Sequence, residues 1–185
     1  PKEYAQELAF LPQQHLVPEG IKVRELIAYG RSPYLNLWGK LSPKDEELVT
    51  WAMAQTQTAE LAEQLVSDLS GGQQQRVFLA MTLAQDAELV LLDEPTTYLD
   101  LNRQAELMGM MRQMQQNGKT VITVLHDLNQ ACRYCDYLIV MKKGAVMAQG
   151  TPDEVMTEEL LKDVFDLDVI IYRDPISNTP MFILK

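Results

Sequence analysis

An uninterrupted apolar run, residues 89–92, ends directly in two acids, Asp93 and Glu94. A short run without polar positions is typical of a strand that is buried on both faces, as in a parallel sheet. Three similar runs alternate with segments of helical spacing, at residues 8–11, 121–125 and 137–141. This alternation predicts an α/β fold in which helices cover a parallel sheet.

Helical spacing dominates the rest of the chain. It extends from Glu19 to Ala84, where a turn-rich loop interrupts it and Ser42-Pro43 is the expected start of the next helix. Thr151 begins a capping box for a late helix. The expected later elements are helices at 99–117, 127–134 and 151–165 and short strands at 169–172 and 181–184.

The composition restricts the class of protein. A length of 185 residues suits one domain, or one domain with a substantial insertion, and can bury a sizeable core. The hydrophobic fraction of 46% excludes a disordered chain. The formal net charge of −10 argues against broad binding to nucleic-acid phosphates. Every apolar run is far shorter than the roughly 18 residues of a membrane span. The chain does not open with a basic and then apolar segment, so no secretory signal is expected.

Cys132 and Cys135 form a C-x-x-C pair. Redox pairs of this kind lie at the start of a helix, where the helix dipole lowers the thiol pKa. Here the pair falls late in an expected helix, and no second pair completes a zinc site. We expect two reduced thiols of a cytosolic protein, with a redox or metal role as the alternative.

Polar side chains follow three of the expected strands. Gln13 follows the first, Asp93 and Glu94 follow the run at 89–92, and His126 follows the next. Ligands of parallel sheets bind beyond the carboxyl ends of the strands, so these residues would share one rim. One carboxylate can hold a hard cation such as Mg²⁺ while the other addresses water. The set predicts activation of water against a phosphate, the alternative being solvated strand ends.

Two glycines follow the capping residue of another helix. Ser70 and Gln73 have the capping-box spacing, and Gly71 and Gly72 occupy the first turn. Glycine there costs roughly 1 kcal/mol relative to alanine, so it needs a compensating reason. Close approach of an anion to the exposed N–H groups is such a reason. The segment is therefore a candidate phosphate site.

In order along the chain, these motifs resemble those of ATP-binding-cassette (ABC) ATPases. Gln13 matches the Q-loop glutamine, residues 69–73 the signature motif, 89–94 the Walker B strand, 97–100 the D-loop and His126 the switch histidine. A finer similarity is to ATPase subunits of ferric siderophore and ferric dicitrate importers, with cobalamin importers as close relatives. It is carried by residues 18–20, 28–33, 97–98 and 126–131.

The resemblance implies a role for each matched residue. Asp93 and Gln13 would hold Mg²⁺, Glu94 would polarise the attacking water, Gln13 would also touch that water, and His126 would contact the γ-phosphate. ATP held by the opposite subunit of a two-fold dimer would be gripped by the signature residues Ser70, Gly71, Gly72 and Gln73. Asp100 would line the dimer interface. The implied cofactors are ATP and Mg²⁺.

The resemblance also implies a P-loop, which the sequence does not contain. Gly118-Lys119-Thr120 is the only G-K-[ST] triplet, but Gln113 stands where the first glycine belongs and a strand follows. We expect a P-loop NTPase-like fold that is incomplete at its N-terminus, and a chain that is inactive alone. Its expected parts are an ATPase core at 1–13 and 84–150, an inserted helical subdomain at 14–83 and C-terminal elements at 151–185.

The function implied by the resemblance is ATP-driven import of an iron(III) complex or cobalamin. The implied partners are membrane permease subunits, a second ATPase subunit and, indirectly, a substrate-binding protein, at the cytoplasmic side of the inner membrane. No nucleic-acid partner is expected. The alternatives are a soluble ABC ATPase acting on DNA or the ribosome, and a non-catalytic module without a P-loop. The short connection between Gln13 and Ser70 and the acidic charge favour the transporter.

Overall fold

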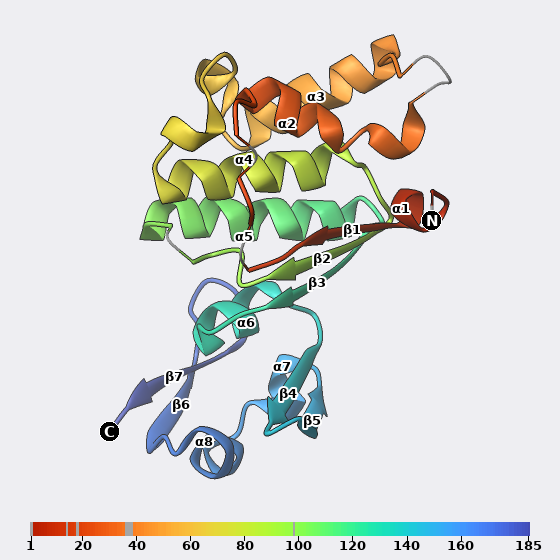
Figure 1. Cartoon of the computed structure of the whole chain (residues 1–185). Helices are drawn as coiled ribbons and strands as arrows, with labels where there is room; N and C mark the ends of the chain where they lie inside the picture. The colour runs from red at the N-terminus through yellow and green to blue at the C-terminus, as the bar shows by residue number, and fades with distance from the viewer. Residues whose placement is uncertain (1, 14, 18, 36–38, 98) are drawn as a thin grey trace. The chain divides into compact units, whose positions relative to one another are not determined.

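The computed structural model describes residues 2–13, 15–17, 19–35, 39–97 and 99–185. The chain forms two compact units, residues 1–124 and 125–185. The first unit has one three-stranded sheet and the second has two two-stranded sheets, and each unit has its own helices (Figure 1). None of the described helices is both long enough and apolar enough to span a membrane.

A parallel sheet of three strands is the centre of the first unit. Its strands are β1 (Leu8–Leu11), β2 (Leu89–Asp93) and β3 (Thr120–Val124), in the order β1-β2-β3. Helices α4 (Gly71–Ala84) and α5 (Leu101–Gln116) lie on one side of this sheet (Figure 1). The parallel α/β core predicted from the sequence is thereby confirmed.

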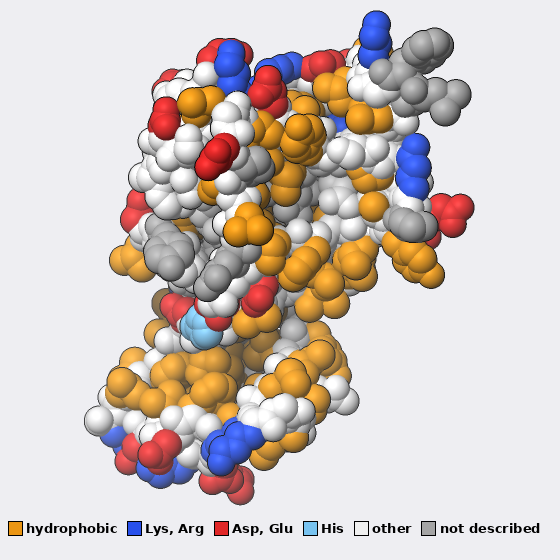
Figure 2. Space-filling view, viewed as in Figure 1, with side chains coloured by type: hydrophobic (Ala, Val, Ile, Leu, Met, Phe, Trp, Pro, Cys, Tyr) orange, Lys and Arg blue, Asp and Glu red, His pale blue; other side chains and the backbone are white. Residues whose placement is uncertain are grey.

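The two faces of this sheet differ in exposure. Side chains that alternate with the exposed ones, such as Val90 and Leu92, are buried. On the opposite face Phe10 and Ile122 each retain 53% of their accessible surface. Hydrophobic side chains are visible at the surface in both units (Figure 2).

Helices inserted between β1 and β2 complete the first unit. Helix α2 packs against α4, and α3 packs against both. A methyl group added to Gly30 would lie 2.2 Å from the carbonyl oxygen of Met81, so glycine allows α2 to approach α4 closely. The other elements here are α1 (Tyr4–Glu7), α2 (Val23–Tyr29), α3 (Pro43–Gln55) and the short 3₁₀ helices Ser32–Tyr34, Ala59–Leu61 and Val66–Asp68.

The second unit has two antiparallel hairpins. Strand β4 pairs with β5, and β6 pairs with β7. Their side chains share a core with three helices, in which Cys132, Leu161 and Val169 are almost fully buried. The elements are α6 (Leu128–Tyr134), β4 (Leu138–Lys142), β5 (Ala145–Gly150), α7 (Pro152–Val155), α8 (Glu158–Phe165), β6 (Val169–Arg173) and β7 (Pro180–Leu184).

Two sequence-based expectations for this unit are wrong. The strand expected at 137–141 does not join the parallel sheet but pairs with β5, a strand that was not predicted. Lys143 and Gly144 both have positive φ, as a tight two-residue hairpin turn requires. The helix expected over 151–165 is two helices, because α7 ends at Val155 and Thr157 caps α8 by accepting from the N–H of Leu160.

Candidate functional site

The ends of β1 and β2 bring two predicted site residues into contact. Gln13 lies two residues beyond β1, and Glu94 directly follows β2. Gln13 Nε2 donates a hydrogen bond of 2.8 Å to Glu94 Oε2. Thr97 Oγ1 donates to the same oxygen over 3.4 Å. The parallel register of β1 and β2 explains this meeting, because it places both carboxyl ends at one edge of the sheet.

The backbone turns sharply at Glu94. Its φ is +50°, in the left-handed region that non-glycine residues seldom adopt. The Thr97 N–H donates to the Glu94 carbonyl oxygen over 3.2 Å and closes the turn. Asp93 is the last residue of β2, and its carboxylate is half-buried. Strand end and turn therefore present two adjacent carboxylates at the edge where Gln13 lies.

The candidate phosphate segment forms the capped N-terminus of α4. Ser70 Oγ accepts from the Gln73 N–H over 3.4 Å, and Gln73 Oε1 accepts from the Ser70 N–H over 2.9 Å. This confirms the predicted capping box. A methyl group added to Gly71 would meet no atom within 4 Å. The packing of the described chain therefore gives no reason for glycine at that position, and the helix end is open to a ligand.

A further predicted residue, Asp100, also caps a helix. Asp100 is the N-cap of α5, and its Oδ1 accepts from the Arg103 N–H over 3.0 Å. Tyr98 and Pro18, which belong to the matched motifs, lie outside the described residues. His126 is exposed and lies in the second unit, just before Asp127, the N-cap of α6. Its expected place beside Glu94 stays a prediction.

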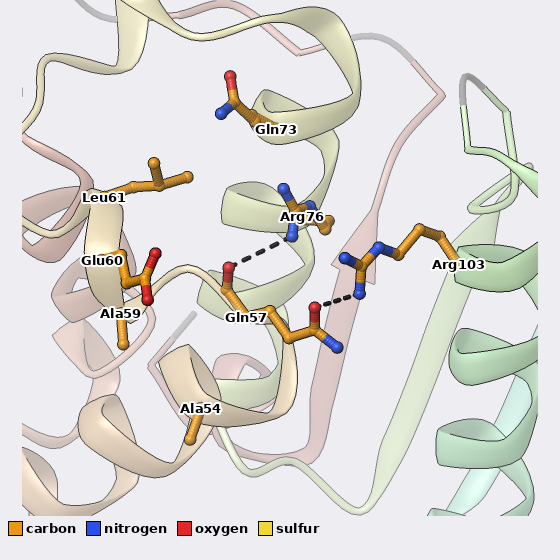
Figure 3. A pocket seen from close by; sticks show the side chains of 8 residues that line it. All are labelled: Ala54, Gln57, Ala59, Glu60, Leu61, Gln73, Arg76 and Arg103. Atoms are coloured by element: carbon orange, nitrogen blue, oxygen red, sulfur yellow. Dashed lines mark hydrogen bonds between the residues drawn. The ribbon is translucent and has the colours of Figure 1, made fainter.

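An open pocket of about 470 Å³ lies beside the first turns of α4. Gln57 is its central residue, with a positive φ of 53°. Its carbonyl oxygen accepts from Arg76 Nη1 over 3.2 Å, and its side-chain oxygen accepts from Arg103 (Figure 3). These contacts join α4 to α5, the two helices that begin at Gly71 and Leu101. Nothing in the sequence pattern singles out Gln57.

The cysteine pair has the environment of structural thiols. Both cysteines are free, and Cys132 is buried in the core of the second unit. Burial, helped by the neighbouring Cys135, raises the pKa of the Cys132 thiol to about 12. Such a thiol stays protonated at neutral pH and is a poor nucleophile. Within the described residues, no cluster of His, Cys, Asp and Glu could hold a metal ion on its own.

Comparison with known proteins identifies the family of this chain and several of its relatives. The family described as ABC transporter matches residues 1–97. The achromobactin transport ATP-binding protein CbrD of Dickeya dadantii is 52% identical over 97% of this chain and 67% of its own length. The iron(3+)-hydroxamate import ATP-binding protein FhuC of Bacillus subtilis is 46% identical over the same shares. The chain thus spans about two thirds of the length of these relatives.

Solved structures of ABC transporter proteins are also similar to this chain. A transporter described as of the metal-chelate ABC type, in an inward-facing conformation, matches with a TM-score of 0.82 at 26% identity, over 97% of this chain and 73% of that one. The cassette MJ0796, solved as a dimer after hydrolysis with ADP and phosphate bound, matches with a TM-score of 0.71 at 27% identity. That match covers 81% of this chain and 65% of the cassette.

The α/β fold with its parallel sheet is that of the ATPase cassettes of ABC transporters. The chain belongs to the ABC transporter family. Family members that serve importers as ATP-binding subunits are ATPases, and they work as dimers together with membrane permeases.

Proposed function

We propose that the chain belongs to the ATPase subunit of an importer that takes up an iron(III) complex of the siderophore type. The hydrogen bond between Gln13 and Glu94 carries the ATPase part of the proposal, because it brings together the residues that match the Q-loop glutamine and the acid that follows the Walker B strand. The names of the relatives, which refer to achromobactin transport and iron(3+)-hydroxamate import, support the substrate class. Ferric dicitrate and cobalamin are the other substrates to be tested.

In the proposed mechanism, Glu94 acts as the general base that orients and polarises the attacking water. A carboxylate at the carboxyl end of a buried strand suits this role, since it is fixed by the sheet yet open to the ligand edge. Gln13 holds the Glu94 carboxylate through its amide N–H. His126 would contact the γ-phosphate.

The oxygen donors at this edge fit Mg²⁺. Gln13 uses its amide nitrogen on Glu94, so its amide oxygen is the atom that can face a cation. Asp93 offers a carboxylate from the end of β2. Mg²⁺ in phosphate sites typically takes one or two protein oxygens and completes its shell with water and phosphate. Asp93 and Gln13 would hold the ion, which supplies charge neutralisation on the phosphates.

The remaining predicted residues act across a two-fold dimer. Ser70, Gly71, Gly72 and Gln73 would contact ATP bound to the other subunit through the open N-terminus of α4. Asp100 would lie at the interface between the subunits. We further propose that the dimer binds transmembrane permease subunits at the cytoplasmic face of the inner membrane, and that a substrate-binding protein delivers the iron complex.

Transport by the purified complex tests this function. The transporter that contains this subunit is reconstituted into liposomes, and ATP-dependent accumulation of radiolabelled ferric siderophore, ferric dicitrate and cobalamin is compared. We expect a ferric chelate to accumulate and to stimulate ATP hydrolysis. Accumulation of cobalamin alone would contradict the proposed substrate. Hydrolysis that responds to DNA or ribosomes and not to the permease would contradict a transport role.

A further inference from the structure

A second set of contacts surrounds the Gln13–Glu94 pair. His15 lies two residues beyond Gln13, and its ring stacks on Phe78 of α4 with the centroids 4.2 Å apart and the planes at 24°. His15 Nε2 lies 2.9 Å from Oε1 of Gln75, which is buried on the same helix. The segment that follows β1 is thus fastened to α4 by both a stack and a hydrogen bond.

The other contact of Gln75 fixes the direction of this hydrogen bond. Gln75 Nε2 donates to the carbonyl oxygen of Pro95 over 3.5 Å. A carbonyl oxygen can only accept, so the amide oxygen of Gln75 is the atom that faces His15. His15 Nε2 must therefore carry the proton and donate it. His15 Nδ1 is buried without a hydrogen-bond partner among the described residues.

These contacts, together with the chain that connects them, form a closed set around the candidate site. Gln13 donates to Glu94, the chain continues to Pro95, Pro95 accepts from Gln75, and Gln75 accepts from His15. In the sequence, His15 is two residues from Gln13, which completes the set. Because Gln75 belongs to α4, this set of contacts includes the helix whose N-terminus is the signature segment.

We propose that His15 is a positioning residue for ATP hydrolysis. By donating to Gln75, it holds the segment after β1 so that Gln13 stays within hydrogen-bond distance of Glu94. It also links this pair to α4, so that the placement of the signature helix and that of the water-polarising carboxylate depend on each other. The inference rests on the proposed function and adds to it a residue that acts through Gln13.

The burial of the residues that support Gln13 favours this role for His15. The Gln13 side chain is exposed, so its own packing does not hold it in place. Phe78 and Gln75 are buried and belong to a 14-residue helix, which makes them a rigid support. Pro95, which directly follows Glu94, is among the most fully buried side chains and therefore holds the chain in place next to Glu94.

Two substitutions of His15 separate the hydrogen bond from the stack. His15→Phe keeps an aromatic ring against Phe78 and removes the donor. His15→Gln places an amide N–H near the position of Nε2 and removes the ring. In the transporter, His15→Phe should lower kcat about five- to tenfold with KM for ATP changed less than about twofold, because the loss of one hydrogen bond displaces Gln13 and not the phosphate-binding groups. His15→Gln should recover most of the rate.

The matched control is Leu16→Ala. This neighbouring side chain is 95% exposed, and its removal should leave basal ATP hydrolysis unchanged. A normal rate in His15→Phe, an increase in KM with unchanged kcat, or a His15→Gln variant as slow as His15→Phe would each overturn the proposal.

A double-mutant cycle tests the partnership with Gln75. If His15 acts through this residue, His15→Phe combined with Gln75→Leu should be no slower than the slower single variant. Rate losses that multiply would show independent roles and overturn the proposal.

Amide hydrogen exchange gives a readout that does not need activity. Without nucleotide, His15→Phe should speed exchange in the segment that follows β1 and leave exchange in α5 unchanged. An unchanged rate in that segment would overturn the inference. If the wild-type transporter does not hydrolyse ATP, the proposed function fails, and the exchange data still decide whether His15 positions the segment.

Discussion

Glu94 combines a left-handed backbone with a carboxylate that two neighbouring side chains hold from one side. Gln13 and Thr97 both donate to its Oε2. A glutamine in its place has almost the same shape but cannot accept a proton from water. In the transporter, Glu94→Gln should lower ATP hydrolysis by about 10²- to 10⁴-fold, the usual contribution of a general base, and leave ATP binding in place. Steady-state phosphate release and nucleotide binding measure the two effects.

Glu88→Gln is the matched control for this variant. Glu88 is exposed and precedes the same strand at its opposite end. It should hydrolyse ATP at the wild-type rate. A Glu94→Gln rate within a few-fold of wild type would show that another group activates the water.

The meeting of Gln13 and Glu94 could be predicted from the sequence because it follows from strand order alone. Neighbouring parallel strands end at the same edge, and polar residues that follow them meet there. The contact of His15 with Gln75 could not be predicted in this way. It depends on which side of α4 faces the segment after β1, and a polar helix start such as Gln73-Gln74-Gln75 does not reveal which glutamine is buried.

The packing of helix α2 against helix α4 depends on a close approach of their backbones at Gly30. An added Cβ at Gly30 would lie 2.2 Å from the Met81 carbonyl oxygen and 3.2 Å from the Gln85 backbone nitrogen. Both neighbours are backbone atoms, so the helices themselves must move apart. Gly30→Ala should reduce the free energy of unfolding by about 1–3 kcal/mol, the usual cost of overpacking. Denaturant unfolding of the purified protein measures this change.

Gly109 provides the opposite case. It lies within α5, and an added Cβ would meet no atom within 4 Å. Gly109→Ala should therefore increase the free energy of unfolding by about 0.5–1 kcal/mol, because alanine loses less backbone entropy in a helix. Equal effects of the two substitutions would contradict the close approach of α2 to α4.

A buried ion pair connects the start of α3 with the end of α4. Arg31 and Asp45 side chains are only 4% and 7% exposed, with Nε and Oδ1 2.8 Å apart. Arg31 Nη1 also donates to the Ala84 and Gln85 carbonyl oxygens at the end of α4. Burial alone would raise the pKa of the Asp45 carboxyl, but hydrogen bonds from Ser42 and the pairing with Arg31 outweigh it and lower the pKa.

This pKa shift predicts a pH dependence of stability. Because the pKa of Asp45 is lower in the folded than in the unfolded chain, its contribution is complete above its unfolded pKa, near 3.9, and is lost as the pH falls through the lower folded value. Asp45→Asn should cost about 3 kcal/mol at neutral pH, since it leaves Arg31 without its counter-charge. It should also remove this part of the acid sensitivity. Unfolding free energies of both proteins from about pH 6 to pH 3 test this, and parallel curves would contradict it.

Element boundaries were predictable where a side chain itself marks them. Ser42 and Thr151 cap helices where the sequence indicated. The β4–β5 hairpin was not predictable, because Lys143 takes a positive φ without the asparagine or aspartate that usually signals such a turn. The break after α7 could not be predicted, because the apolar spacing continues past Thr157, whose capping role depends on the turn of the chain there.

For the whole molecule, the candidate residues divide unevenly between the two units. Gln13, Ser70, Glu94 and Asp100 lie in the first unit, while His126 follows its boundary within two residues. Sequence spacing relates residues that share a sheet, but His126 begins a unit with a hydrophobic core of its own. The contact expected between His126 and the γ-phosphate therefore stays a prediction.

Assembly gives the sharpest test of the signature segment. In a two-fold dimer each ATP would lie between Glu94 of one subunit and Gly71 of the other. Gly71→Ala adds a methyl group that meets nothing within its own chain, so the subunit should fold normally. It should nevertheless block approach of the phosphate to the N-terminus of α4. Dimers made only of Gly71→Ala or only of Glu94→Gln subunits should therefore both be inactive.

A mixed dimer of these two variants distinguishes action across the interface from action within one subunit. If Gly71 serves the other subunit's ATP, one site carries both changes and the second carries neither. The mixed dimer, purified through two different tags, should then hydrolyse ATP at the rate of a control dimer of wild-type and Glu94→Gln subunits, which also has one intact site. If Gly71 serves its own subunit, each site carries one change. The mixed dimer would then be as inactive as the two parent dimers while the control dimer stays active, and that result would refute the assignment of the signature residues.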